Sequence, residues 1–244
     1  MILEIEKLTY IDVARFIKEG FKKVIIPVGC VEPHGPHLPL GTDTIIPYEL
    51  AVEIAQSVKA LVAPPVYYGI VTSLYGYTGA ITVNANVFQN LIKDIILSLR
   101  QYGFEVFILL NGHGGNATAL DLLLRELWTK EHIKSILINW WIYARSITMQ
   151  VFNEQGAHAG IDETAMILVK HPELIKNKEL ISSSAYLYED GIHVYPFPGA
   201  IILHAEKEGL PSFDDKKAEE FRDKVKTMLI DKINDISKRF TEIS

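Results

Sequence analysis

The sequence contains very little cysteine. Cys30 is the only one among 244 residues, so a disulfide scaffold is excluded, and the composition fits a reducing compartment. Two interpretations of Cys30 stay open. It is either a catalytic thiol or a small buried residue at the end of a strand, and burial is the commoner fate of a free cysteine.

Long hydrophobic runs are missing as well. No apolar stretch approaches the ~20 residues that a membrane-spanning helix needs. Residues 1–10 show no basic segment followed by an apolar stretch, which argues against a signal peptide. We therefore expect a cytoplasmic protein that makes no use of a membrane.

Positive charge is not in excess. The chain has 24 Lys and Arg against 30 Asp and Glu, a formal net charge of −6. Nucleic-acid-binding proteins gather Lys and Arg to neutralise phosphates, whereas charges of both signs alternate along residues 214–239, a pattern typical of a solvated helix face. We expect no nucleic-acid partner. A small-molecule substrate is the expected partner, and it can carry a phosphate because a phosphate needs only a few local groups.

Short apolar runs alternate with longer amphipathic stretches along the chain. With 48% hydrophobic and 22% charged residues, the composition is that of a globular protein, and the length fits a single domain over residues 1–244. The patterns predict strands at 24–29, 61–69, 105–112 and 135–141, and helices at 11–19, 44–58, 86–102, 116–131, 161–170 and 215–239.

The sequence also predicts where one strand and one helix lie in the fold. Pro64 and Pro65 restrict the strand at 61–69 to a sheet edge or a strand end. The helix at 86–102 is predicted to bury one apolar face. That face consists of Leu91, Ile95, Ile96 and Leu99.

Continuous apolar strands separated by helices predict βαβ units and a parallel sheet that is covered on both faces. In such a sheet, ligands bind beyond the carboxyl ends of the strands. The most polar and unusual segments of this sequence follow directly after the strands predicted at 24–29 and 105–112.

The first of these segments, residues 29–43, reads GCVEPHGPHLPLGTD. Glu32 and His34 are two residues apart, so in an extended chain they face the same side. Carboxylate and imidazole are ligands for Zn, Fe or Mn, and a carboxylate such as that of Asp43 can bridge two metals. The alternative is a polar loop in which Asp43 only caps the next helix. For His37, an outer-sphere role and a substrate contact are both open.

The second segment, residues 111–116, reads NGHGGN at the end of a predicted strand. A tight turn explains its glycines but does not explain His113, which we interpret as a ligand. The N–H groups of Gly114 and Gly115 at the start of the following helix can hold an oxyanion or a phosphate. The spacing matches neither a dinucleotide-binding fingerprint nor a P-loop.

The third segment, residues 157–164, reads AHAGIDET and opens a helix. Glu163 is either a residue that favours the helix N-terminus or a metal ligand or general base, with His158 as acid or transition-state stabiliser. Together the segments supply the donors that two hydrolytic metal ions need. These are Glu32, His34, Asp43, His113, His158 and Glu163.

In order and spacing, the three segments resemble the metal-binding segments of the creatininase family. The resemblance covers residues 29–164 and implies a three-layer α/β/α fold with a mostly parallel central sheet, a homohexamer, and two divalent ions (Zn, Fe or Mn) per chain. It implies that Glu32 and His113 hold one metal, that His34 and Glu163 hold the other, and that Asp43 bridges them. His158 would assist proton transfer or bind the substrate, and Glu163 would be a ligand, a base or both.

Two departures from the family pattern argue against creatinine as the substrate. True creatininases carry a Glu two residues after the His of the second segment, where this chain has Gly115, and a Trp shortly before the third segment, where residues 151–156 have none. In addition, Leu74 and Ala80 stand where the family often has a His before a Gly-Thr pair, which leaves the subfamily open.

The leading substrate hypothesis is therefore a formamidopyrimidine ribonucleotide, which an archaeal relative deformylates in riboflavin and deazaflavin biosynthesis with iron as its implied metal. Creatininase proper and a peptide-trimming relative of mycofactocin maturation are the alternatives within the enzyme class. From another class, a non-catalytic metal- or nucleotide-binding subunit is the rival. Four tyrosines either stack on a flat heterocycle or pack as wall residues. They are Tyr67, Tyr68, Tyr75 and Tyr77.

Overall fold

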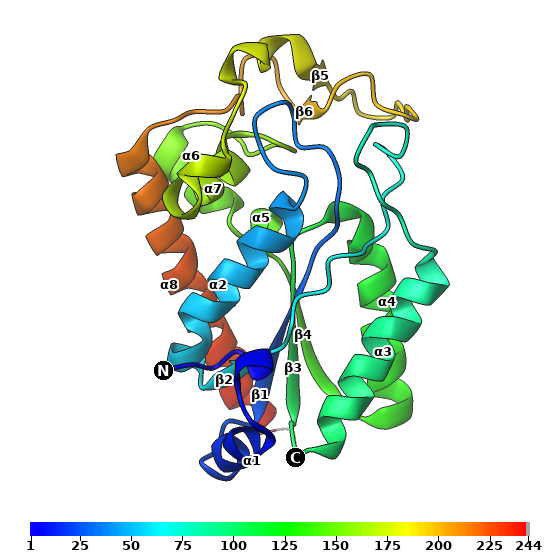
Figure 1. Ribbon diagram of the computed structural model, residues 1–244, viewed down its shortest axis with the longest axis vertical. Coiled ribbons are helices and arrows are strands. Elements are labelled where there is room, and N and C mark those ends of the chain that lie inside the picture. Colours follow the sequence, from blue (N-terminus) through cyan, green and yellow to red (C-terminus); the bar gives the residue numbers. More distant parts are fainter. Residues whose placement is uncertain (243–244) are drawn as a thin grey trace.

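A computed structural model describes residues 1–242 of the chain. Its centre is a four-stranded sheet in the order β2-β1-β3-β4, in which every neighbouring pair is parallel, as expected from the sequence. The strands are β1 (Lys23–Val28), β2 (Ala60–Val62), β3 (Val106–Asn111) and β4 (Lys134–Asn139). Their side chains are largely buried, because helices cover both faces of the sheet (Figure 1).

The helices form the two outer layers (Figure 1). On one side, α3 packs on α4, and α4 packs on β4; on the other side, α2 packs on β1 and β2, and α8 packs on α2, α6 and α7. The longer helices are α1 (Tyr10–Lys18), α2 (Thr42–Val58), α3 (Ala85–Gln101), α4 (Ala117–Glu131), α6 (Arg145–Phe152), α7 (Ile161–Lys170) and α8 (Asp215–Phe240). The predicted three-layer α/β/α architecture is confirmed. Within residues 1–242, no helix combines the length and the hydrophobicity that a bilayer crossing requires.

Three sequence predictions differ from the structure in detail. The strand predicted at 61–69 is only Ala60–Val62 at the sheet edge, and Pro64 and Pro65 follow it. The strand predicted at 135–141 ends at Asn139, because Trp140 begins a short helix, α5 (Trp140–Tyr143).

The third difference concerns the buried face of α3. Phe88, Ile92 and Ile96 are its buried residues, whereas Leu91 is 45% exposed, so the prediction of Leu91 as a core residue is wrong. Successive residues of a helix are about 100° apart around its axis. Phe88, Ile92 and Ile96 therefore share one face at intervals of four residues, and Leu91 lies to the side of that face.

The chain between α7 and α8 forms an excursion above the carboxyl ends of the central strands (Figure 1). It contains the parallel strands β5 (Ala185–Leu187) and β6 (Ile201–Leu203), and a bridge between His158 and Ile202 ties it to the third motif. The short 3₁₀ turns of the chain are η1 (Ile5–Lys7), η2 (Gly114–Asn116), η3 (Pro172–Leu174), η4 (Lys178–Leu180) and η5 (Ser182–Ser184). The sequence patterns did not predict β5, β6, α5 or α6.

Two glycines bring the strand ends and the first turn of α2 together. Val28 of β1 lies opposite Asn111 of β3, so Gly29 and Gly112 begin adjacent loops. A Cβ atom would lie 2.3 Å from the Asp43 carbonyl oxygen if added at Gly29, and 2.0 Å from it if added at Gly112. Because both positions lack that atom, the backbone of Asp43 fits between the first two motifs.

Candidate metal centre and pocket

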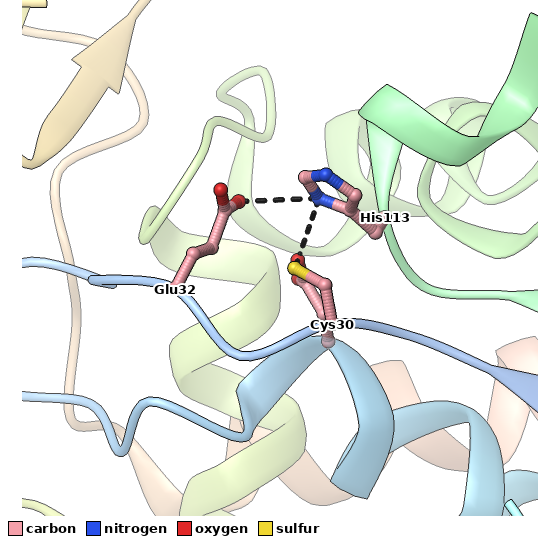
Figure 2. A group of neighbouring side chains, drawn as sticks. Cys30, Glu32 and His113 are labelled. Carbon is pink, nitrogen blue, oxygen red and sulfur yellow. Dashed lines mark hydrogen bonds and ion pairs between the residues drawn. The ribbon is translucent and has the colours of Figure 1, made fainter. Parts of the chain in front are cut away.

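The first two motifs meet at Asp43. One carboxylate oxygen of Asp43, Oδ1, lies 2.8 Å from His34 Nε2, and the other, Oδ2, lies 2.8 Å from His113 Nδ1. Glu32 Oε1 lies 3.1 Å from the same nitrogen of His113 (Figure 2). Gly41 precedes α2 without a side-chain cap, so the two oxygens of Asp43 face two different imidazoles instead of capping the helix.

Glu163 joins the same cluster from the first turn of α7. Its Oε2 lies 3.7 Å from His34 Nε2 and accepts a hydrogen bond of 2.7 Å from the Ala159 N–H. Ala159 has φ +56°, a left-handed conformation that costs roughly 1–2 kcal/mol for a residue with a Cβ. This strained turn directs the Ala159 N–H at Glu163 and so orients the carboxylate toward His34.

Three imidazoles share one arrangement. His34 Nδ1 lies 3.0 Å from the Glu32 carbonyl oxygen, His113 Nε2 lies 2.9 Å from that of Ile70, and His158 Nε2 lies 2.8 Å from that of Pro33. A carbonyl oxygen only accepts, so each of these nitrogens donates. The other nitrogen of each ring faces the carboxylates, which is the arrangement that fixes the tautomer of metal-binding histidines.

Buried charge dominates the electrostatics of this cluster. Burial alone would lower the pKa of His34, but Asp43 and Glu163 outweigh it and raise the pKa to about 10. For Asp43, burial would raise the pKa, but the neighbouring His34 and His113 hold it well below its usual range. Burial raises the pKa of Glu163 well above its usual value. Among residues 1–242, the only ion-pair partners of the carboxylates of this cluster are imidazoles, with no Lys or Arg.

The donor set fits divalent metal ions. Two groups of donor atoms, each within 4.8 Å of one another, share Asp43, and a third joins Glu32, His34 and His158. The two that share Asp43 are Cys30, Glu32, Asp43 and His113, and His34, Asp43 and Glu163. Deprotonated carboxylates and neutral imidazoles are the forms that bind metal, and a divalent cation offsets the negative charge that protonated imidazoles otherwise neutralise.

His158 and His37 take different places. The side chain of His158 is 19% exposed, with Nδ1 3.7 Å from Glu32 Oε1, and it lines the pocket. His37 lies outside the pocket lining, and its Nε2 contacts Thr164 Oγ1 at 2.9 Å. Burial and the nearby His34 lower the pKa of His37 to about 4. Of the two roles open for His37, the outer-sphere one fits this position next to Glu163.

Cys30 is completely buried, as the sequence favoured, and it does not line the pocket. Its Sγ lies 3.1 Å from Asp43 Oδ2, and burial, followed by the charge of Asp43, raises the thiol pKa well above its usual value. A thiol in this position has no access to a substrate in the pocket, so the interpretation of Cys30 as a nucleophile has no structural support.

The second motif forms one rim of the pocket. Gly114 and Gly115 line it, and as the first residues of a helical turn they have N–H groups without an acceptor inside that turn. A Cβ added at Gly115 would lie 2.2 Å from the Ile70 carbonyl oxygen and 2.5 Å from His113 Nε2. There is therefore no room for a glutamate at residue 115 without a shift of the backbone. Glu163 instead joins the cluster beside His34.

The pocket has a volume of about 830 Å³ and extends from the cluster to the chain between α7 and α8. Several lining residues carry no local motif in the sequence, because α5, α6 and this excursion bring them together. They are Trp141, Arg145, Tyr188, Asp190, Phe197 and His204. Asp162 also lines the pocket, and its burial raises the carboxyl pKa to about 6. None of the four tyrosines weighed as stacking residues lines the pocket.

Comparison with known proteins agrees with the motifs. The sequence profile described as creatinine amidohydrolase, of the creatininase family, matches residues 6–205. The creatinine amidohydrolase of Pseudomonas putida is 25% identical over 187 residues, 69% of this chain and 72% of the relative. The mycofactocin precursor peptide peptidase of Mycolicibacterium smegmatis is 30% identical over 164 residues, 65% of this chain and 62% of the relative.

Another relative has a name that states a different reaction. The 3-dehydro-scyllo-inosose hydrolase of Thermotoga maritima is 30% identical over 170 residues, 65% of this chain and 54% of the relative. Among solved structures, a creatinine amidohydrolase has a TM-score of 0.78 at 22% identity, covering 96% of this chain and 97% of that chain. A manganese creatininase has a TM-score of 0.77 at 21% identity, covering 96% and 98%. These structural likenesses establish the fold.

The profile match spans most of the chain and contains all three motifs, whose side chains converge on one buried donor cluster. The chain therefore belongs to the creatininase family of metal-dependent amidohydrolases, which act on C–N amide bonds.

Proposed function

We propose that this chain is a dinuclear metallohydrolase that removes a formyl group from a formamidopyrimidine ribonucleotide. The observation that carries the dinuclear site is the position of Asp43, whose two oxygens each lie 2.8 Å from a different, carbonyl-anchored imidazole. A carboxylate placed in this way can serve two metal ions at once. Creatininase structures of a Zn-Zn type and with Mn support divalent metals as the cofactor.

In this proposal Glu32 and His113 would hold one ion, His34 and Glu163 would hold the other, and Asp43 would be a ligand of both. Bound divalent ions supply a Lewis acid for the carbonyl oxygen and lower the pKa of water toward neutrality. Zn, Fe and Mn all accept this ligand chemistry.

The surrounding residues of the chain position and protonate the substrate. The N–H groups of Gly114 and Gly115 hold the oxyanion that forms when water adds to the formyl carbon. His158, with Nδ1 turned toward Glu32, and Glu163 transfer a proton from the attacking water to the leaving nitrogen. The C–N bond then breaks, and the products are formate and the pyrimidine amine.

The far wall of the pocket supports a substrate that is flat and anionic. Trp141, Tyr188 and Phe197 line the pocket, and aromatic side chains of this kind can stack on a heterocycle. Arg145 lines the same wall, and within residues 1–242 it has no acidic partner at ion-pair distance. Arginine binds phosphate through two parallel N–H donors, so a ribonucleotide phosphate fits this wall. The volume of about 830 Å³ also exceeds the needs of creatinine and lies within the usual range for ligand pockets.

A second candidate substrate is the C-terminal segment of a peptide. Its carboxylate suits Arg145 as well, and the mycobacterial peptide peptidase is 30% identical to this chain. Creatinine itself carries no phosphate or carboxylate for Arg145. We further propose a homo-oligomer, with the hexamer implied by the family resemblance as the expected state.

Formate release from the metal-loaded protein tests the substrate. The formamidopyrimidine ribonucleotide is compared with its dephosphorylated nucleoside, with creatinine and with a peptide, and wild-type protein is compared with R145Q. We expect formate from the ribonucleotide and a KM for it that rises about tenfold or more in R145Q, since charge-assisted hydrogen bonds contribute about 1.5–3 kcal/mol. The nucleoside should respond little to R145Q. Turnover of creatinine or peptide without formate release from the ribonucleotide would contradict the deformylase assignment.

A further inference from the structure

The single thiol of the chain lies in the metal cluster. Cys30 Sγ is 3.1 Å from Asp43 Oδ2 and within 4.8 Å of the donor atoms of Glu32 and His113. Figure 2 shows the sulfur of Cys30, the carboxylate of Glu32 and the imidazole of His113 directed toward one another. Three metal donors of two established types, the carboxylates of Glu32 and Asp43 and the imidazole of His113, thus lie around the sulfur.

These four donor atoms lie close enough together to share one metal ion, since all are within 4.8 Å of one another. Bond lengths of about 2.3 Å to sulfur and about 2.1 Å to nitrogen and oxygen put the ligands of a tetrahedral zinc ion about 3.5 Å apart. The separations here are 3.1 Å between Cys30 and Asp43, 2.8 Å between Asp43 and His113, and 3.1 Å between His113 and Glu32. Separations longer by about 0.4 to 0.7 Å would reach the spacing of a tetrahedral sphere.

We propose that Cys30 supplies a sulfur ligand to the ion held by Glu32, Asp43 and His113. The inference rests on the proposed metal centre and adds a difference between its two positions. One position offers sulfur, nitrogen and carboxylate oxygen, whereas the other, at His34, Asp43 and Glu163, offers nitrogen and oxygen only. On binding, the thiol proton leaves to solvent and a metal–sulfur bond forms.

Ligand softness gives the sulfur a chemical consequence. Thiolate favours Zn²⁺ and Co²⁺ over Mn²⁺, while carboxylate and imidazole accept all three. The position next to Cys30 therefore selects zinc or cobalt, and the position next to Glu163 accepts a harder ion. A protein offered both Zn²⁺ and Mn²⁺ takes up zinc first at the Cys30 position.

Cobalt absorption tests the sulfur bond directly. Metal-free, reduced wild-type protein is titrated with Co²⁺ under anaerobic conditions, and near-ultraviolet and visible spectra are recorded. We expect a thiolate-to-cobalt charge-transfer band in the near ultraviolet that saturates with the first equivalent per chain. Because the chain has one cysteine, that band can arise only from Cys30. In C30S and C30A the band is lost, while the visible cobalt bands of the carboxylate and imidazole ligands remain.

The outcomes separate this inference from the proposed function. Visible cobalt bands without charge transfer in wild-type protein would show that Cys30 only donates a hydrogen bond to Asp43, and would overturn the inference while leaving the metal centre intact. Absence of any bound cobalt would overturn both. Metal affinity is not the readout, because loss of an outer-sphere hydrogen bond also weakens binding about 10- to 100-fold. The wild-type spectrum decides even if C30S is unstable.

Discussion

Helix α2 carries two acidic residues that have opposite surroundings. Asp43 is buried, and the side chain of Glu53 is 18% exposed. Near its start, Asp43 faces His34 and His113. Ten residues later, Glu53 pairs with Lys170, with Arg222 Nε at 3.1 Å and with Lys226 Nζ at 3.9 Å. Both clusters contain carboxylates that are at least partly buried, but only the second contains Lys and Arg side chains, which stay charged at neutral pH.

The difference shows how a structural charge cluster is distinguished from a metal centre. Burial would raise the pKa of Glu53, but Lys170 and Arg222 outweigh it and lower the pKa, so the protein neutralises this carboxylate itself. At Asp43 only the imidazoles supply positive charge, and they do so only when protonated. A buried cluster of carboxylates that lacks Lys and Arg is the one that an external cation completes.

We expect the largest effect from substitution of Asp43, which should strongly weaken metal binding in the first cluster and leave the second cluster unchanged. D43N should lose more than about a hundredfold in metal affinity, because loss of an outer-sphere partner alone costs about 10- to 100-fold, and hydrolysis should fall to background. Calorimetric metal titration measures the affinity. E53Q is the matched control on the same helix and should bind metal like the wild type. Equal metal affinity in D43N and wild type would contradict the assigned role of Asp43.

Within the first cluster, His158 should separate catalysis from metal binding. H158Q should lower kcat about 10²- to 10⁴-fold, the usual contribution of general acid–base catalysis, and should keep its metal content, since the pairs around Asp43 do not include His158. Steady-state kinetics and metal analysis on the same sample measure both quantities. A loss of metal in H158Q would instead make His158 a ligand.

In the second cluster, E53Q should act on stability. Arg222 is 2% exposed, and loss of its charged partner leaves a buried cation, so the free energy of unfolding should fall by about 3–5 kcal/mol. Denaturant unfolding of the metal-free proteins measures it. K224Q provides a control on α8, the helix that also carries Arg222. Lys224 is 34% exposed and pairs with Glu220, which is 53% exposed, so the free energy of unfolding should change by less than about 1 kcal/mol. Unchanged stability in E53Q would mean that the cluster is not a structural pair.

A smaller effect should appear with pH. The pKa of Glu53 in the folded state lies below its ordinary value of 4.5, so its contribution to stability is fully present above about pH 4.5 and is lost as pH falls through the folded-state pKa. The stability difference between wild type and E53Q should therefore shrink below about pH 4.5. A difference that grows with acid would contradict the direction of the shift.

Much of the fold and of the cluster could be predicted because its signals are local. The apolar runs before residues 29–43 and 111–116 predicted parallel strands, and the carboxyl ends of adjacent parallel strands bring both motifs to one edge of the sheet. Glu32, His34, Asp43 and His113 therefore converge through a rule of topology. Glu163 joins them because its motif opens a helix at the same edge.

The pocket wall could not be predicted in this way. Arg145 and Tyr188 come from elements without a shared period or motif, and three-residue strands such as β5 give no alternation to detect. The directions of side chains in loops could not be predicted from the sequence either. The left-handed turn at Gly35 separates His37 from His34. For Cys30, burial could be predicted from the residue type, whereas the contact with Asp43 could not.

Metal stoichiometry of the wild-type protein tests the central claim most directly. Metal-free protein is equilibrated with Zn²⁺, dialysed, and analysed by mass spectrometry for zinc per chain. The arrangement of two donor groups around Asp43 predicts about two ions per chain. A protein that is folded and retains no zinc, and that binds no Mn²⁺ or Fe²⁺ either, would contradict the claim that this buried cluster is a metal centre.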